Sequence, residues 1–596
     1  MNAHYNPVWE MDTVFAGGSE SADFAAFLDQ LETGIAALGE HVHKAKAVQE
    51  NEKASVWQEL LANIQDITAR LKEAGAFTSC LTAQNVHDEN AKLISGRLKK
   101  LSAAFGAVLN TWEEQLLALS DEAWSELVES EAIKSLAFPL NERRRRAKEK
   151  LSVDQEILAN DLAIDGYHAW QDLYNTVVGR IAIPHEVDGE VKQLSVGQAA
   201  NVMHSPDRVV RQEMFGKWEA AWANEADLCA HALNHLGGFR LNLYRHRGWD
   251  SVMKEPLDIN RMSEATLDAM WAAINEGKKS LVAYMNRKAK LLGLEKLGWA
   301  DESAPVGSAT KTVSYDEAAA FIIEQFGRFS PKMADFARKA FEQRWIEAED
   351  RPGKRPGGFC TSFPISKQSR IFMTYAGNAS NVSTLAHELG HAYHQHVMND
   401  LPQMVQGYAM NVAETASTFA EMIVSDAAVK HATSNEEKIA LLDDKIQQSV
   451  AFFMNIHSRV IFEQNFYAER KKGLVSKAVL NHLMEEAQKE AYCGALADYH
   501  PHFWASKLHF YITSYPFYNF PYTFGYLFSL SIYARALEEG ASFEQKYIDL
   551  LRDTARMTVE DLAAKHLGVD ITKPDFWRAA VKLTEKDVEE FLRITE

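Results

Sequence analysis

The chain has 596 residues, and its 63 basic against 82 acidic side chains give a formal net charge of −19. This surplus of negative charge argues against DNA, RNA or an anionic membrane as a partner, because all three repel a negative surface. Glycine and proline occupy only 31 and 15 positions, below the average of about 12%, so the composition predicts a helix-rich chain.

The N-terminal third has the apolar spacing of long amphipathic helices. Residues 21–47 and 55–73 each place their apolar side chains on one face, and helical patterns continue to about residue 178. Two short apolar runs then flank Asp188-Gly189, which is a strong signal for a β-hairpin near residues 181–194. We therefore expect an N-terminal helical domain over residues 1–195 and a second helical domain over residues 196–596.

Three further features bear on location and partners. The basic run Asn141–Lys150 contains interleaved acids, which favours a solvated helix or turn over a nucleic-acid site. The N-terminus has no apolar secretory segment, and the four cysteines form no CxxC pair, so we expect a reducing, cytoplasmic setting. Residues 508–534 lack Asp, Glu, Lys and Arg, but their prolines and many tyrosines favour a buried wall over a membrane span.

Residues 351–386 are rich in Gly, Pro and Ser, and they include the β-like run Arg370–Tyr375. We expect a loop and a pair of strands there, followed by a helix that begins near Ser383. Residues 387–391 then read His-Glu-Leu-Gly-His. A surface helix that carries two histidines is the plain alternative for such a short motif.

On a helix, His387 and His391 are four residues apart and share one face, so both imidazoles can reach one metal ion. Glu388 is rotated by about 100° and lies beside the ion's open position. Zinc lowers the pKa of its bound water and polarises a carbonyl group, while a nearby carboxylate can remove the water proton. The motif therefore predicts a zinc hydrolase site with Glu388 as the general base.

A third metal ligand is required, and the sequence leaves several candidates. His394 and His396 are close, but the extended HExxHxxGxxH pattern would need histidine at Val397. The next predicted helix, over residues 409–424, carries Glu414 and Glu421 on one face. Spacing favours Glu414 as the ligand but leaves Glu421 open, either as the ligand or as a group that orients a histidine.

The motif and its surroundings resemble the M3 family of zinc metallopeptidases, and within it the oligoendopeptidase F branch. The segments that carry the resemblance are HELGHAYH at 387–394, NVAETASTFAE at 411–421, GGFC at 357–360, SRIFMTYAGNASNVSTLAHELGH at 369–391, PFYNFPYTFGYLFS at 516–529 and the opening WEMDTVFAGGSES. The resemblance implies a mainly α, clam-like fold with a small β element beside the zinc helix and a deep channel for short peptides. It also implies one zinc ion per chain, with Glu414 as the third ligand.

The resemblance further implies that a downstream histidine and tyrosines hold the substrate and stabilise the tetrahedral intermediate. A phenol or an imidazolium can donate a hydrogen bond to a developing oxyanion. For each tyrosine, ordinary core packing is the alternative. The matching positions are His509, Tyr515, Tyr522 and Tyr526, with Tyr518 as a further substrate contact.

In the family, an extended segment beside the zinc helix lets the substrate backbone add as a strand. Gly357 and Gly358 would permit close approach of the two backbones, although a plain tight turn is the alternative for either glycine.

These observations predict a zinc endopeptidase that hydrolyses internal bonds of short peptides, through a zinc-bound water activated by Glu388. One alternative is a zinc exopeptidase of the carboxypeptidase or dipeptidase type on a similar scaffold. A catalytically silent helical protein that binds peptides is a second. Neither the oligomeric state nor the cleavage-site preference follows from the sequence.

Overall fold

The computed structural model describes residues 4–45, 53–187, 189–307 and 312–596. Helices dominate these ranges, as the composition predicts, and only two small sheets accompany them. Asp188 of the expected hairpin turn lies outside the described residues. The strands on either side of it, β1 (Ile183–Val187) and β2 (Glu190–Leu194), pair in antiparallel register.

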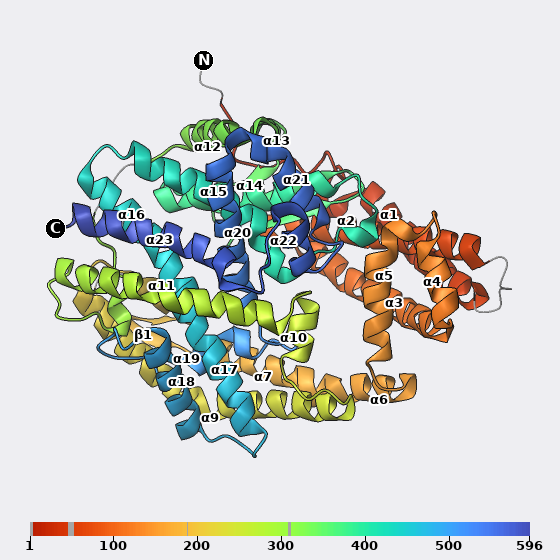
Figure 1. Ribbon diagram of the computed structural model, residues 1–596, viewed down its shortest axis with the longest axis horizontal. Coiled ribbons are helices and arrows are strands. Elements are labelled where there is room, and N and C mark those ends of the chain that lie inside the picture. Colours follow the sequence, from red (N-terminus) through yellow and green to blue (C-terminus); the bar gives the residue numbers. More distant parts are fainter. Residues whose placement is uncertain (1–3, 46–52, 188, 308–311) are drawn as a thin grey trace.

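The N-terminal helices lie at one side of the molecule (Figure 1). In the first of them, Phe24, Leu28 and Leu31 are buried at helical spacing, and side-chain caps at Asp88 and Ser120 begin two of the later helices. The helices of this group are α1 (Ala22–Ala45), α2 (Lys53–Gln84), α3 (Glu89–Ala118), α4 (Asp121–Glu129) and α5 (Ala137–Lys148).

The remaining helices form the larger part of the molecule. Those that precede the HELGH motif are α6 (Val153–Ala163), α7 (Ala169–Arg180), α8 (Val196–Val202), α9 (Arg208–His246), α10 (Lys254–Ile259), α11 (Glu264–Leu291), α12 (Tyr315–Phe329) and α13 (Pro331–Glu342). From the motif onward they are α14 (Ala379–Met398), α15 (Met410–His431), α16 (Asn435–Val450), α17 (Ile456–Arg470), α18 (Lys477–Ala491), α19 (Phe503–Ser506), α20 (Phe520–Glu539), α21 (Glu544–Asp553), α22 (Val559–Leu567) and α23 (Pro574–Ile594).

The buried apolar side chains form two clusters. One is drawn from residues 9–140, together with Phe363, Phe372 and Val405. The other is drawn from residues 163–591 and includes side chains of α6 and α7. The expected domain boundary between residues 195 and 196 stays a prediction.

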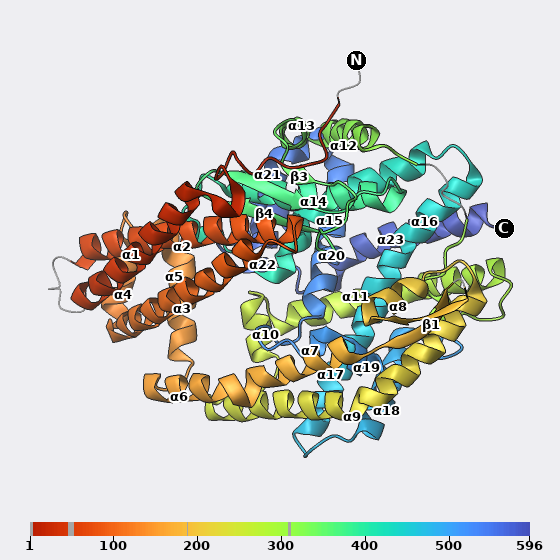
Figure 2. The same ribbon diagram turned by 180° about the vertical axis from the view of Figure 1, so that it is seen from behind.

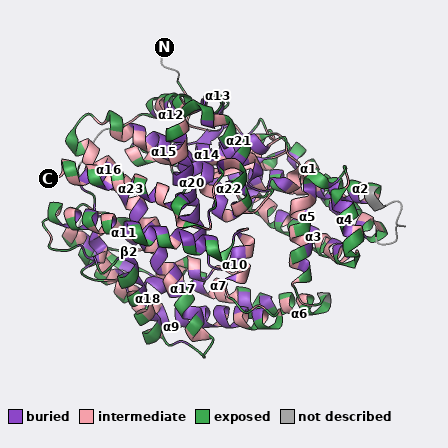
Figure 3. Ribbon diagram, viewed as in Figure 1, coloured by how far each residue is buried: buried purple, intermediate pink, exposed green. Residues whose placement is uncertain are grey.

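Three helices, α14, α15 and α20, pack together at the centre, where buried positions concentrate (Figure 3). Two glycines allow this close approach. A Cβ atom at Gly390 of α14 would lie 2.4 Å from the carbonyl oxygen of Ala416 in α15. A Cβ atom at Gly525 of α20 would lie 2.9 Å from the carbonyl oxygen of Asn411. Within the described ranges, none of the helices combines the length and apolar character that crossing a bilayer requires.

A three-stranded sheet lies beside α14 (Figure 2). Its strands are β3 (Ile346–Glu347), β4 (Phe359–Phe363) and β5 (Gln368–Phe372), in the order β3-β5-β4. The expected strand run Arg370–Tyr375 thus begins within β5. Because β5 is central and already pairs with a strand on each side, a substrate strand cannot add to it. The edge strand beside the candidate site is β4, which follows Gly357 and Gly358.

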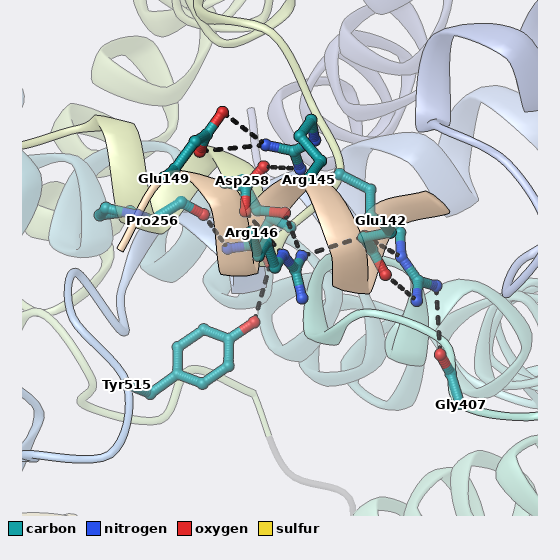
Figure 4. A network of polar contacts seen from close by, with 10 residues as sticks. Glu142, Arg145, Arg146, Glu149, Pro256, Asp258, Gly407 and Tyr515 are labelled. Atoms are coloured by element: carbon teal, nitrogen blue, oxygen red, sulfur yellow. Dashed lines mark hydrogen bonds and ion pairs between the residues drawn. The ribbon is translucent and has the colours of Figure 1, made fainter. Parts of the chain in front are cut away.

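The basic run forms a helix, as expected, but it is only partly solvated, because Arg144 is buried and other residues of the run form ion pairs. Arg146 Nε donates to Asp258 of α10 at 2.7 Å, and Arg145 pairs with the same carboxylate. Glu142 accepts from Nε and Nη2 of Arg261, each at 2.9 Å (Figure 4). Opposite charges within the run find partners across the molecule, so α5 is joined to α10. We call these contacts the α5–α10 network.

The α5–α10 network extends toward the central helices. Arg261 Nη1 donates to the carbonyl oxygen of Gly407, in the loop between α14 and α15, at 3.1 Å. Asn260 is completely buried, and its Oδ1 accepts from the Tyr515 hydroxyl at 3.3 Å and from the backbone N–H of Asn411 at 3.2 Å. The turn after α10 therefore contacts α5, the α14–α15 loop and the first turn of α15.

Candidate active site

The HELGH motif lies in the middle of α14. The helix begins earlier than the sequence indicates, because Asn378 caps it by accepting from the backbone N–H of Asn381. The expected start near Ser383 and Thr384 was therefore wrong by about one turn. The earlier start places His387 and His391 well inside the helix, where the backbone is fixed on both sides.

Three side chains converge beside this helix. Nε2 of His387 lies 3.3 Å from Oε2 of Glu414, and Nε2 of His391 lies 3.5 Å from the same oxygen. One ligand atom from each of the three residues lies within 4.8 Å of the other two. Two imidazoles and one carboxylate at this spacing are the donor set of a three-ligand zinc site with an open position.

Glu414 reaches the histidines because α15 runs antiparallel to α14. Position 390 packs against 416, and 387 meets 421, so residue numbers rise along one helix as they fall along the other. The hydroxyl of Ser417, one turn along α15, donates to Glu414 Oε2 at 2.7 Å. This hydrogen bond fixes the carboxylate that faces both imidazoles.

Glu421 lies behind His387 rather than among the three converging atoms. Its Oε2 is 3.1 Å from Nδ1 of His387, and its Oε1 accepts from the amide of Gln448 at 2.6 Å. A carboxylate at Nδ1 favours the tautomer that carries the proton there, which leaves the Nε2 lone pair free for a metal ion. Of the two acids that the spacing left open, Glu414 faces both histidines and Glu421 orients one of them.

The charges in this cluster favour a bound cation. Burial would lower the pKa of His387, but hydrogen bonds with Glu414 and Glu421 outweigh it and raise that pKa to about 10. Burial would raise the pKa of Glu414, but the contacts with His387 and His391 lower it to about 2. Burial lowers the pKa of His391 to about 4. The surrounding carboxylates thus favour positive charge at His387, which a divalent metal ion would supply when it replaces the proton on Nε2.

Glu388 lines a cavity of about 300 Å³. Burial, reinforced by the charges of Glu414 and Glu421, raises the pKa of Glu388 to about 7. Its Oε2 is buried and has no hydrogen-bond partner among the described residues. A buried carboxylate with a raised pKa and a free oxygen is suited to proton transfer.

The cavity that Glu388 enters is formed by α14 and the edge strand β4. Its lining residues are Gly358, Phe359, Cys360, Thr361, Ser362, Glu388, His391, Gln395 and Tyr408. A Cβ atom at Gly358 would lie 3.4 Å from Oε1 of Glu388 and 3.2 Å from the carbonyl oxygen of Phe372. Gly358 therefore keeps the strand close to the carboxylate. Gly357 has a φ of +89° and open space around it, so its role is to form the turn.

Neither nearby histidine joins the converging group. His394 is completely buried, and its Nε2 contacts the Thr554 hydroxyl at 2.9 Å and the carbonyl oxygen of Leu551 at 3.2 Å. The ring of His396 lies against Phe336, with centroids 4.7 Å apart. Both histidines therefore stabilise packing around α14.

His509, Tyr518 and Tyr522 form one aromatic group. The His509 ring lies 5.7 Å from Tyr518 and 6.0 Å from Tyr522, measured between centroids. Burial raises the pKa of Tyr522, with further contributions from Tyr518 and from the charge of Glu414. Tyr522 thus stays a neutral phenol within electrostatic reach of the converging residues.

His509 differs in one respect from the expectation. Burial, together with the charges of Arg459 and Lys507, lowers its pKa to about 4, so it is a neutral imidazole at pH 7 and not an imidazolium. Its Nδ1 is buried without a hydrogen-bond partner among the described residues. His509 can therefore donate only through a neutral N–H.

The two remaining tyrosines differ, because Tyr515 adjoins this group and Tyr526 packs against other elements. Tyr515 donates to Asn260 and so contacts the turn after α10, while its ring meets that of Tyr518 at 5.6 Å. Tyr526 is 3% exposed, stacks on Phe452 and shares a hydrogen bond of 2.9 Å with Ser449. The structure does not bring Tyr526 to the candidate site, because its direction along α20 is set by packing against Phe452 and Ser449.

Three residues near the site were not predicted from the sequence. Gln395 follows His391 by four residues on α14, so helical spacing could have found it. Tyr408 stacks on His394 with ring centroids 4.2 Å apart and lines the cavity. Asn260 accepts a hydrogen bond from the backbone of Asn411 in α15, although it lies 151 residues earlier in the chain, and no local pattern predicts such a contact.

The chain is similar to known peptidases over most of its length. The family model described as "Peptidase family M3" matches residues 201–583, and one described as "Oligopeptidase F" matches residues 115–182. Oligoendopeptidase F, chromosomal, of Lactococcus lactis subsp. cremoris is 27% identical over 419 residues, 68% of each chain. Oligopeptidase PepF of Bacillus subtilis is 24% identical over 488 residues, 80% of this chain and 72% of that one.

Solved structures share the fold. A Chlamydophila abortus protein described as a peptidase superposes with a TM-score of 0.85 at 19% identity, covering 99% of this chain and 98% of its own. Oligoendopeptidase-F from Enterococcus faecium gives a TM-score of 0.71 at 18% identity, covering 96% and 99%. At these identities the likeness concerns the fold, which is a large assembly of helices.

Proposed function

From the premise that the chain belongs to peptidase family M3 and is a metallopeptidase, we propose that it is a zinc-dependent endopeptidase. It hydrolyses internal bonds of short peptides in the cytoplasm. The observation that carries the proposal is the convergence of His387, His391 and Glu414 beside Glu388, whose buried Oε2 has no hydrogen-bond partner in the described ranges.

The donor set matches zinc, with Nε2 of both histidines and a carboxylate oxygen of Glu414 as ligands. Zinc at such a site lowers the pKa of water and polarises a carbonyl oxygen. Glu421 supports the ligand set by accepting the Nδ1 proton of His387, and Gln448 holds Glu421 in place by donating to its other oxygen. The hydroxyl of Ser417 holds the third ligand in place by donating a hydrogen bond to the Glu414 carboxylate.

Glu388 acts as the general base and then as the general acid. Its carboxylate accepts a proton from the attacking water and delivers it to the nitrogen of the leaving amine. A pKa of about 7 suits both steps, because the group is neither fully ionised nor fully protonated near neutral pH.

The developing oxyanion is stabilised by hydrogen-bond donors on the opposite wall. Tyr522 is a neutral phenol near Glu414, and His509 offers a neutral N–H beside it. Tyr518 contacts both rings and holds the substrate. Tyr515 acts less directly, through Asn260.

The substrate backbone adds to the free edge of β4. This strand lines the cavity together with Glu388, and Gly358 lets the peptide approach the base closely. Binding of this kind requires an extended backbone, so short unfolded peptides are the substrates.

The test is to incubate the protein with peptides of graded length, with and without a chelator, and to identify the products by mass spectrometry. Internal cuts that stop with the chelator and return with zinc are expected. Removal of single or paired terminal residues would instead establish the exopeptidase. Tight peptide binding without cleavage, in protein loaded with zinc, would establish the silent peptide-binding protein and refute the proposal.

A further inference from the structure

Two cations beside His509 have no carboxylate partner. Arg459 lies on α17, and Lys507 stands two residues before His509. Neither forms an ion pair within the part of the chain that the structure describes. Some other buried cations are paired with a carboxylate: Arg211 contacts Asp301 at 3.0 Å, and Lys288 contacts Asp443 at 3.1 Å.

Arg459 and Lys507 lie against the same aromatic ring. The guanidinium carbon of Arg459 is 5.2 Å, and the ammonium nitrogen of Lys507 4.9 Å, from the centroid of Phe503. Arg459 uses Nε and Nη2 to donate to the Asn455 side chain, at 3.0 and 2.7 Å. Its Nη1 and the Lys507 ammonium group have no acceptor among the described side chains and backbone, so both cations keep donors for a ligand.

Glu302, an acid that acts on both cations, does not neutralise this pair. Glu302 attracts both cations electrostatically, but its Oε1 accepts from the Tyr492 hydroxyl at 3.3 Å and lies beyond ion-pair distance of either cation. Two like charges in a partly buried place repel each other, and a bound anion would relieve that repulsion. Burial and the neighbouring Arg459 accordingly lower the pKa of Lys507 to about 7.

The two cations adjoin the residues that the proposed mechanism assigns to the substrate. Their charges act on His509, and Arg459 also acts on Tyr522. The His509 ring in turn lies 6.0 Å from that of Tyr522. Both cationic side chains are half-buried, so each keeps some exposure.

We infer that Arg459 and Lys507 form a carboxylate-binding subsite that holds the C-terminal carboxylate of a peptide substrate. The inference rests on the proposed peptidase function. A guanidinium and an ammonium group together supply the charge-assisted donors that a carboxylate requires. Every linear peptide carries this group at one end, whereas an acidic side chain is present only in some. A subsite near Tyr522 thus favours short peptides and sets the distance of the cut from their C-terminus.

The first test measures binding without turnover. Calorimetry on the Glu388→Gln protein compares a peptide with a free C-terminal carboxylate, its carboxamide, and the carboxamide of the same peptide ending in Glu. The free acid should bind about 10-fold or more tightly than the carboxamide, because hydrogen bonds to a charged group are worth about that much. Equal binding of the acid and the carboxamide would overturn the inference. Restored binding of the Glu-ended carboxamide would assign the subsite to acidic side chains and overturn the C-terminal assignment.

Matched variants test the residues. In the same Glu388→Gln protein, Lys507→Gln or Arg459→Gln should bring the ratio of acid to carboxamide affinity close to one, whereas Lys507→Arg should keep most of it. Lys472, which is 71% exposed, gives the control Lys472→Gln, whose ratio should match the parent. A ratio that survives both Gln substitutions in folded protein would overturn the assignment. Because hydrolysis is measured separately on the unmodified protein, failure of the proposed function remains distinct from failure of the subsite.

Discussion

Nδ1 of His387 lies 3.1 Å from a carboxylate oxygen of Glu421, on the helix that packs antiparallel to its own. The contact decides which nitrogen of His387 carries the proton, and so which nitrogen faces the Glu414 carboxylate. It also explains why an acid seven residues beyond Glu414 is held in a largely buried helix: the charge of Glu421 is used by the imidazole and by Gln448.

Replacing Glu421 by Ala should weaken zinc binding about 10- to 100-fold, because the imidazole loses the acceptor that fixes its tautomer and makes it a better ligand. Competition with a chromogenic chelator measures this change. Glu421→Gln keeps a hydrogen-bond acceptor and should lose less. Equal zinc affinity in the Ala variant and the unmodified protein would show that Glu421 does not support the ligand.

Tyr522 and Tyr526 form a matched pair on α20. Tyr522→Phe should lower kcat about 100-fold or more, because it removes a donor to the oxyanion. Tyr526→Phe removes only the hydrogen bond to Ser449 and should change kcat little. Steady-state kinetics on one peptide compares the two variants. A larger loss of kcat in Tyr526→Phe than in Tyr522→Phe would contradict the roles assigned to these two tyrosines.

Asn260 caps a helix to which it does not belong. The N-cap residue of α15 is Ala409, which has no capping side chain, and Asn260 Oδ1 accepts from the N–H of Asn411 instead. Asn260→Ala should cost about 1–2 kcal/mol, with a lower Tm and weaker zinc binding through Glu414. Asn260→Asp keeps the acceptor oxygen and should retain most of both. Calorimetric melting and chelator competition check this, and an unchanged Ala variant would refute it.

Asp301 supports the catalytic part of the fold through Arg208 and Arg211, with contacts of 3.0 Å to each. Burial would raise the pKa of Asp301, but the hydrogen bonds from the two arginines outweigh it and lower that pKa. Asp301→Asn leaves buried Arg211 without its partner and should destabilise the protein by about 3–5 kcal/mol.

The pH dependence of this loss has a definite sign. A carboxylate whose pKa is lowered by folding contributes its stability above its unfolded pKa of about 3.9 and loses it as the pH falls toward the folded value. The difference in Tm between the unmodified protein and Asp301→Asn should be constant above about pH 5 and shrink below about pH 4. A difference that grew on acidification would contradict this account.

The sequence predicts well what periodicity and short spacing control. The helical class, the shared face of His387 and His391, and the helix that carries Glu414 and Glu421 all follow from repeats within one element. Tyr522 and Tyr526 share one face of α20, but the burial of Tyr526 one turn further along could not be predicted, because Phe452 and Ser449 come from other elements. The edge position of β4 depends on strand order, which no single strand encodes.

Contacts between distant segments were equally beyond prediction. Asn260 and Asn411 are 151 residues apart. The basic run of α5 resembles a solvated helix because its partners are distant in sequence: Asp258 pairs with Arg146 across 112 residues, and Arg261 pairs with Glu142 across 119. The start of α14 was misplaced for a smaller reason: Ser383 and Thr384 are good caps in isolation, but Asn378 comes first.

The most direct test of the central claim compares the unmodified protein with Glu388→Gln, measuring bound zinc by mass spectrometry of the metal and kcat on a short peptide. The account predicts about one zinc ion per chain in both proteins and a loss of at least about 1000-fold in kcat for the variant. Full activity of Glu388→Gln with zinc bound, or equal activity of the unmodified protein after complete removal of the metal, would contradict it.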